Sequence, residues 1–127
     1  MVSGECTRLI CRLNEEEEAD YSGFLGLPLG TGVECVRADA LLEAHRLAAS
    51  RYDREHVCPF LYRHPERFII HRPEVSSEYR FPEGRVTLDT EEDYEILKEL
   101  FSRLYRGSPV PTDLLVQELA RHQSVAR

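Results

Sequence analysis

Apolar side chains recur every three or four residues in five stretches of the chain. The first stretch follows Ser3, a residue type that often caps helices, and it predicts an amphipathic helix over residues 4–18. The same spacing predicts four more helices, over residues 38–50, 53–63, 90–105 and 112–122. Pro59 lies inside the 53–63 segment, so we expect a kink or a split there. In the 38–50 helix we expect the packed face to consist of Leu41, Leu42, His45 and Leu47.

Short apolar stretches between these segments predict strands over residues 32–36, 68–71 and 85–89. Residues 21–32 contain four of the seven glycines, and we expect a loop there and at residues 72–83. Short strands that alternate with longer helices predict the α/β class. Domains usually hold about 100–150 residues, so we expect residues 1–127 to form a single domain.

The charge balance narrows the function classes. The chain has 16 basic and 23 acidic residues, for a net charge of −7, which argues against a general nucleic-acid binder. No apolar run approaches the roughly 18 residues of a membrane span, and the first residues lack the pattern of a signal peptide. Four cysteines permit two disulfides, but their spacing matches no zinc site, and we expect reduced thiols in a cytoplasmic protein.

Asp89 is the most prominent candidate for chemistry. It stands at the carboxyl end of the predicted 85–89 strand, where open α/β sheets bind ligands, and a carboxylate there suits Mg²⁺. The segment Thr90-Glu91-Glu92-Asp93 also fits a helix capping box, and spacing alone favours a capping role for Asp89. The two roles are compatible.

Other polar candidates carry simpler alternatives. Glu34 lies beside the glycine-rich loop, and its side chain faces either a ligand or solvent. The cluster Arg54-Glu55-His56 stands at a helix start, where it binds a polar ligand or, as is more common, places an acid near the helix dipole. The residue pattern by itself therefore indicates a small α/β protein and no specific reaction.

Taken in order, several segments resemble one known family. They are Ala19-Asp20-Tyr21, residues 29–34 (LGTGVE), residues 53–60 (DREHVCPF), residues 64–68 (HPERF) and residues 85–93 (RVTLDTEED). The set resembles the C-terminal half of the cytidylyltransferase family that includes the spore coat polysaccharide biosynthesis protein and the CMP-Kdo and acylneuraminate cytidylyltransferases. The resemblance extends from about residue 19 to the end of the chain.

This resemblance implies a nucleotide-diphosphosugar transferase-like α/β fold, with a short mixed sheet flanked by helices. It also implies a reaction of CTP with an acidic or other sugar that yields a CMP-sugar and pyrophosphate, with Mg²⁺ as cofactor. Asp89 matches the family's second metal-binding aspartate. The positions that match sugar-facing residues of the family are Gly30, Thr31, Gly32, Glu34, Glu55 and His56.

The chain departs from the family pattern in one respect. The family's glycine- and arginine-rich nucleotide loop and its first metal aspartate have no match in this sequence, so we identify no catalytic residue. We expect a partial sugar cytidylyltransferase of polysaccharide biosynthesis that is inactive alone. We also expect a homodimer, since an incomplete sheet exposes a strand edge. The alternative is a non-enzymatic dimeric binding or assembly module derived from the same fold.

Overall fold

The computed structural model describes residues 2–125, and these divide into two compact units. Residues 6–23 and 33–73 form the first, which we call the sheet unit. The remaining described residues form the second, which we call the helical unit. Each unit has its own cluster of buried apolar side chains.

A mixed three-stranded sheet organises the sheet unit, as the α/β class requires. Strand β1 (Tyr21–Gly23) lies in the middle, antiparallel to β2 (Glu34–Val36) and parallel to β3 (Ile70–His71). The loop predicted over residues 21–32 is therefore wrong at its start. All of β1 is buried, so the strand shows no alternation of polar and apolar residues that a sequence pattern could reveal.

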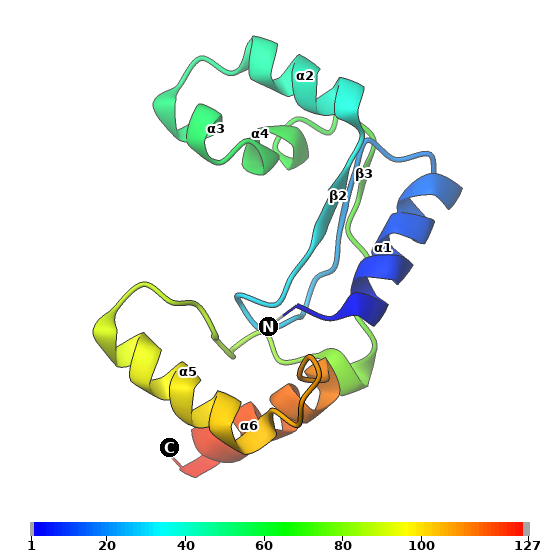
Figure 1. Ribbon diagram of the computed structural model, residues 1–127. Coiled ribbons are helices and arrows are strands. Elements are labelled where there is room, and N and C mark those ends of the chain that lie inside the picture. The colour runs from blue at the N-terminus through cyan, green and yellow to red at the C-terminus, as the bar shows by residue number, and fades with distance from the viewer. Residues whose placement is uncertain (1, 126–127) are drawn as a thin grey trace. The chain divides into compact units, whose positions relative to one another are not determined.

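Four helices accompany this sheet, and Figure 1 shows α1 (Gly4–Glu16) beside the strands and α2 (Ala38–Leu47), α3 (Arg51–Glu55) and α4 (Cys58–Tyr62) grouped together. The expected split of the 53–63 segment is confirmed, because Pro59 stands in the first turn of α4. The expected packed face of α2 is wrong except for Leu47, which packs against the core as expected. Ala40 and Ala44 are the buried residues of that helix, whereas Leu42 is 71% exposed.

Small alanine side chains explain this face of α2. They let the helix backbone approach the core that Phe60, Leu61 and Phe68 build with Tyr21. Leu61 is fully buried at 0% exposure, and it therefore anchors α4 to this core. The first residues of α4, Cys58 and Pro59, line a pocket of the sheet unit.

The helical unit contains a 3₁₀ turn, η1 (Ser77–Tyr79), and two long helices, α5 (Glu91–Leu104) and α6 (Thr112–Val125). Their apolar faces share a core with Val86. The strand predicted over residues 85–89 is wrong, because this segment makes a single parallel bridge, between Arg85 and Leu29. Gly30 follows at φ +100°, a left-handed conformation that turns the partner segment away after one pair.

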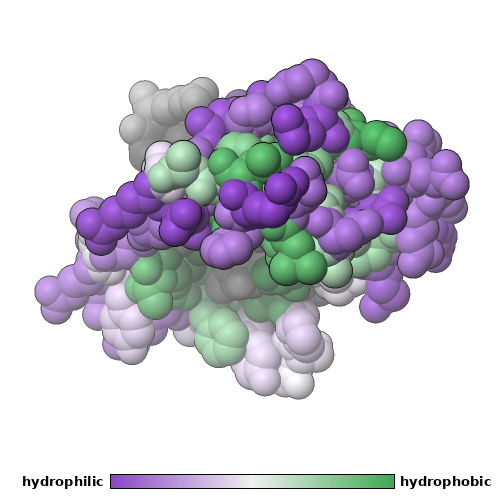
Figure 2. Space-filling view, turned by 90° about the horizontal axis from the view of Figure 1, so that it is seen from above, coloured by the Kyte–Doolittle hydropathy of each residue, from purple (hydrophilic) through white to green (hydrophobic). Residues whose placement is uncertain are grey.

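The surface agrees with the charged composition. On the face seen in Figure 2, hydrophilic residues predominate and hydrophobic residues form smaller groups between them. None of the helices within residues 2–125 combines the length and the apolar character needed to cross a bilayer.

Candidate functional site

Two of the predicted sugar-facing residues line one pocket in the sheet unit. This pocket has a volume of about 380 Å³, and its lining consists of Glu34, Tyr52, His56, Cys58, Pro59 and Tyr62. Glu34 begins β2, whereas His56 follows α3, so the fold brings together two motifs that are distant in the sequence. We call this space the Glu34 pocket.

A buried tyrosine holds the Glu34 carboxylate. The Tyr21 hydroxyl donates a 2.6 Å hydrogen bond to Glu34 Oε2. Gly23 stands opposite Glu34 in the sheet, and a Cβ atom there would lie 2.7 Å from the Tyr21 hydroxyl oxygen. The sequence Tyr21-Ser22-Gly23 thus leaves room for the phenol to reach across to Glu34.

A thiol approaches the same carboxylate. Cys58 is the first residue of α4, and its side chain hydrogen-bonds to Glu34. Burial raises the pKa of the Cys58 thiol to about 11, with further contributions from the charge and the hydrogen bond of Glu34. Burial also raises the pKa of the Tyr21 phenol above its usual value, again helped by Glu34. Both groups therefore remain neutral donors to the Glu34 carboxylate at physiological pH.

Aromatic rings form much of the remaining wall. The Tyr62 ring lies 5.5 Å from the Tyr21 ring, and the Tyr52 ring lies 4.8 Å from the His56 ring, measured between centroids. The Arg72 guanidinium lies 4.5 Å from the centre of the Tyr62 ring. Flat aromatic faces beside a carboxylate suit a ligand that has both a C–H face and polar edges, as sugars do.

The other predicted sugar-facing residues lie elsewhere. Glu55 ends α3 and is exposed, but it does not line the Glu34 pocket. Gly30, Thr31 and Gly32 belong to the helical unit, where Thr31 is buried and its hydroxyl donates to the Pro28 carbonyl at 2.8 Å. These local contacts explain a turn, and a contact of these four residues with sugar stays a prediction.

Thr90 and Asp93, and not Asp89, form the cap of the helix that follows. The N-cap of α5 is Thr90, whose side chain accepts from the Asp93 backbone N–H, while the Asp93 carboxylate accepts from the Thr90 N–H at 3.0 Å. The capping box is therefore confirmed, and the capping role expected for Asp89 is wrong. The side chain of Asp89 is 71% exposed and lies 3.2 Å from Arg85.

Arg85 holds Asp93 through both carboxylate oxygens, at 3.0 and 2.9 Å. The backbone N–H of Asp89 donates a further bond to Asp93 at 2.9 Å. This backbone bond is the largest cause that lowers the pKa of Asp93, and the bonds from Thr90 and the charge of Arg85 add to it. The Asp93 carboxylate is thus saturated by its own neighbours, which is typical of a structural group.

A complete metal site is absent from the described part of the chain. Within residues 2–125, no three side chains of His, Cys, Asp or Glu are placed to hold one ion. Asp89 offers one exposed carboxylate, and the Arg85 cation lies beside it. Mg²⁺ often takes one or two protein carboxylates together with waters and substrate phosphates, so Asp89 fits a contributing ligand but no complete site.

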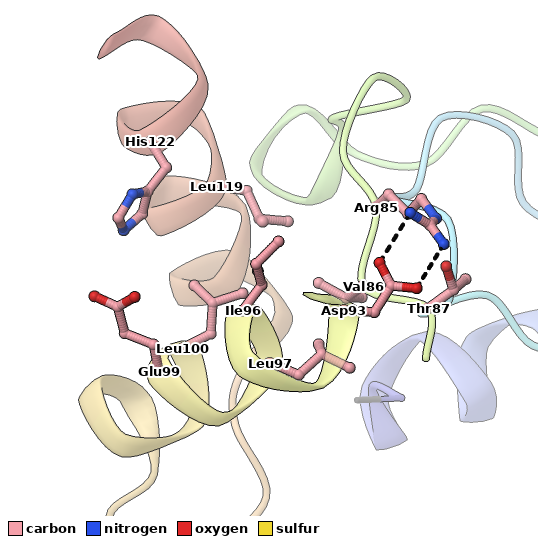
Figure 3. Close-up of a pocket in the computed structure, with 10 residues that line it drawn as sticks. All are labelled: Arg85, Val86, Thr87, Asp93, Ile96, Leu97, Glu99, Leu100, Leu119 and His122. Atoms are coloured by element: carbon pink, nitrogen blue, oxygen red, sulfur yellow. Dashed lines mark hydrogen bonds and ion pairs between the residues drawn. The ribbon is translucent and has the colours of Figure 1, made fainter. Parts of the chain in front are cut away.

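A second pocket of about 390 Å³ lies in the helical unit. Figure 3 shows Arg85 and Asp93 at one side and Glu99 and His122 at the other, with apolar side chains of α5 and α6 between them. Val86, Leu100 and Leu119 of this lining also belong to the core of the unit. The pocket is therefore continuous with packing between the helices, and it includes none of the predicted site residues.

Sequence reasoning missed five residues of the site, one of which, Pro59, was expected only to interrupt a helix. Tyr21 and Cys58 lie within the motifs that carried the family resemblance, but nothing in their spacing shows that both contact Glu34. Tyr52 and Tyr62 have the pattern of ordinary helix members. A signal for these side chains exists only in three dimensions, where Tyr52 of α3 and Tyr62 of α4 line the same pocket as Glu34 of β2.

Comparisons with known proteins place this geometry in context. Residues 2–119 match the sequence profile of a family described as "Cytidylyltransferase". The spore coat polysaccharide biosynthesis protein SpsF of Bacillus subtilis is 30% identical over 127 residues, which cover 98% of this chain and 52% of SpsF. The uncharacterized protein MJ1063 of Methanocaldococcus jannaschii is 38% identical over 82 residues, which cover 64% of this chain and 33% of that protein.

A solved structure supports the fold. A cytidylyltransferase from Leptospira borgpetersenii aligns with a TM-score of 0.79 and 21% identity, over 98% of this chain and 53% of that one. The chain thus spans about half the length of SpsF and of this structural relative. The profile match covers most of the chain and agrees with the structural alignment, and the chain belongs to the cytidylyltransferase family.

Proposed function

We propose that this chain supplies the sugar-binding part of a cytidylyltransferase that joins CTP and a sugar into a CMP-sugar for polysaccharide biosynthesis in the cytoplasm. The observation that carries the proposal is the Glu34 pocket, in which Glu34 and His56, from two separate family motifs, line one space. The name of the SpsF relative supports the link with polysaccharide biosynthesis.

Each part of the pocket has a role in this proposal. Glu34 accepts hydrogen bonds from the sugar, and Tyr21 fixes the carboxylate so that little freedom is lost on binding. Tyr52 and Tyr62 pack against the ring of the sugar. His56 offers a ring nitrogen to a hydroxyl group. Such positioning raises the effective concentration of a sugar hydroxyl at the phosphate that it attacks.

Asp89 is the residue that we propose as a ligand of the Mg²⁺ that accompanies CTP. When bound, Mg²⁺ neutralises phosphate charge and orients the leaving group. The exposed carboxylate is available for this contact. The other ligands that the family requires have no match in this chain, and we therefore expect the chain alone to be inactive.

Sugar binding tests the central part of the proposal. The folded chain is titrated with a panel of monosaccharides while backbone amide shifts are followed by NMR. We expect shifts at β2, α3 and α4, and we expect the variant His56→Ala to weaken them. The matched control is His45→Ala, an exposed histidine on α2 outside the pocket lining. Absence of binding by every sugar would contradict the proposal.

A calorimetric titration with CTP tests the expected inactivity. We expect no heat of binding with or without Mg²⁺. Binding of CTP that requires Mg²⁺ would show that this chain holds nucleotide by itself, and our account of a partial enzyme would be wrong. In that case, Asp89→Asn should abolish the Mg²⁺-dependent binding of CTP, since it removes the proposed metal ligand.

The second candidate is a non-enzymatic dimeric module. The observation that favours it is the three-stranded sheet, in which β2 and β3 both lie at an edge. We propose a homodimer under either function, and light scattering of the purified chain measures its mass. A dimer that binds neither sugar nor CTP would favour the module.

A further inference from the structure

We propose that Cys11 and Cys35 form a redox switch, in which a peroxide joins the two thiols in a reversible disulfide that ties α1 to β2. The switch acts on the strand that begins with Glu34, and it therefore links the Glu34 pocket to the oxidants around the protein. This inference is independent of the proposed function, because it concerns the chemistry of two thiols and the position of one strand.

The sheet register places both thiols between α1 and β2. Ser22 stands opposite Cys35 in the pairing of β1 with β2, so the two side chains point to the same face of the sheet. That face carries α1 (Figure 1), because the Ser22 hydroxyl donates a 2.6 Å hydrogen bond to Asn14 Oδ1. Cys11 lies three residues before Asn14, on the same side of the helix. The register thus directs Cys11 toward Cys35, and the two thiols form a hydrogen bond.

The two thiols differ in exposure, and this difference assigns their roles. Cys11 is exposed on α1, whereas Cys35 is half-buried in β2. Burial raises the pKa of the Cys35 thiol, and the hydrogen bond with Cys11 and the charges of Cys11 and Glu15 add to this effect. Cys35 therefore keeps its proton, and Cys11 is the thiol that reacts first with an oxidant from solvent.

The reaction balances with hydrogen peroxide as the oxidant. The Cys11 thiolate attacks one peroxide oxygen, the O–O bond breaks, and a sulfenic acid and hydroxide form. The Cys35 sulfur then attacks the Cys11 sulfur, so that an S–S bond forms and the S–O bond breaks. The two hydroxide ions released take up the protons of the two thiols. Two thiols thus lose two electrons, the peroxide becomes two waters, and a small dithiol restores both thiols by exchange.

The disulfide acts on the strand that carries Glu34. Bonded sulfur atoms lie about 2 Å apart, closer than any hydrogen-bonded pair, so the new bond draws β2 toward α1. β2 lies at an edge of the sheet, where β1 is its neighbouring strand. Glu34 precedes Cys35 and points to the opposite face, where it accepts the hydrogen bond of Tyr21. We therefore expect oxidation to disturb the contact between Tyr21 and Glu34.

Peptide mapping tests the disulfide. The folded chain is treated with hydrogen peroxide, the remaining thiols are blocked with iodoacetamide, and the chain is digested with trypsin without reductant. Trypsin cleaves after arginine and places the four cysteines in separate peptides, residues 1–8, 9–12, 13–37 and 55–63. We expect peptide 9–12 to be linked to peptide 13–37 at least about tenfold more often than any other pair, and dithiothreitol to release the link. Absence of this link, or a predominance of Cys11–Cys11 links between two chains, overturns the inference.

Two variants and a matched control identify the partners of the bond. Cys11→Ser changes an exposed side chain, so we expect the fold to persist and the intramolecular link to disappear. Cys35→Ser should remove the same link from its other side. The control is Cys58→Ser, which removes a half-buried thiol of the same unit and should leave the link intact. An intramolecular disulfide of equal yield in Cys11→Ser, or loss of the link in Cys58→Ser, overturns the inference.

Amide shifts measured by NMR test the effect on the strand. In the oxidised chain we expect shifts at Tyr21 and Glu34 that dithiothreitol reverses, and we expect the same peroxide treatment to cause no such shifts in Cys11→Ser. A disulfide that forms without a shift at Glu34 overturns the switch and leaves only a site of oxidation. Neither experiment contains a sugar or CTP, so the proposed function is tested separately.

Discussion

Two carboxylates, one in each unit, receive several hydrogen bonds but differ in the groups that donate them. Asp93 accepts from two backbone N–H groups and from both arms of Arg85. Glu34 accepts from a phenol and a thiol, both neutral, and faces a pocket. Asp93 is therefore fully engaged in holding a helix start, whereas Glu34 keeps charge and acceptor capacity for a ligand.

The contrast teaches how to separate structural acids from functional ones. A carboxylate whose charge is neutralised and whose oxygens are saturated by its own chain has little left to offer a substrate. A carboxylate that is fixed by neutral donors beside a cavity is oriented but still charged. By this criterion Asp89, exposed and paired only with Arg85, lies between the two.

Breaking either core should give the largest effects. Leu61 supports the Glu34 pocket through α4, and Leu115 supports the helical unit through α6; they are 0% and 1% exposed. We expect Leu61→Ala and Leu115→Ala each to lower the free energy of unfolding by about 2–5 kcal/mol. Urea denaturation measures this, and Leu42→Ala, at a 71% exposed position, should change it by less than about 0.5 kcal/mol. A similar loss in all three variants would contradict the assigned cores.

Removing the cap of α5 should give an effect of intermediate size on the free energy of unfolding, and it allows a comparison with the loss of the Glu34 charge. Thr90→Ala removes the side chain that accepts from the Asp93 N–H, and we expect a loss of about 1 kcal/mol in unfolding free energy. Glu34→Gln should change stability by less than about 0.5 kcal/mol, since we propose that its carboxylate serves a ligand rather than the fold. A larger loss in Glu34→Gln than in Thr90→Ala would reverse the roles that we assign to the two regions.

Acid titration distinguishes the two carboxylates further. Because the folded-state pKa of Asp93 is lowered, it contributes stability above the pKa of an unfolded aspartate, about 4, and loses it as pH falls below that value. We therefore expect the melting temperature to fall below about pH 4. The fall should be smaller in Asp93→Asn, which does not titrate, and unchanged in Glu17→Gln. An equal fall in Asp93→Asn would show that another acid, and not Asp93, causes the loss.

What the sequence could predict depends on the range of the interactions. The capping box of α5 was predictable, because Thr90 and Asp93 stand three residues apart and satisfy each other locally. The split at Pro59 is local for the same reason. Strand β1 was not predictable from pattern, since its pairing partners, β2 and β3, come from later in the chain.

The candidate site shows the same limit. The family resemblance pointed to Glu34 and His56, and the structure places both in one pocket. It also pointed to Glu55, the last residue of α3 and the neighbour of His56, which does not line the pocket. A motif marks a stretch of chain, but the fold decides which side chains of that stretch share a space.

Thiol reactivity provides the smallest and most local test. With a pKa of about 11, Cys58 holds roughly a hundredfold less thiolate near neutral to mildly basic pH than an ordinary cysteine, so iodoacetamide should modify it slowly. Glu34→Gln removes the charge that helps to raise this pKa, and we expect several-fold faster alkylation of Cys58 by peptide mass spectrometry. Asp93→Asn removes a carboxylate that is not among the causes of the raised pKa of Cys58, and it should leave the rate unchanged. If Asp93→Asn accelerates the alkylation of Cys58 as much as Glu34→Gln does, the cause is a general loosening of the fold. The reactivity of the thiol then does not report on Glu34.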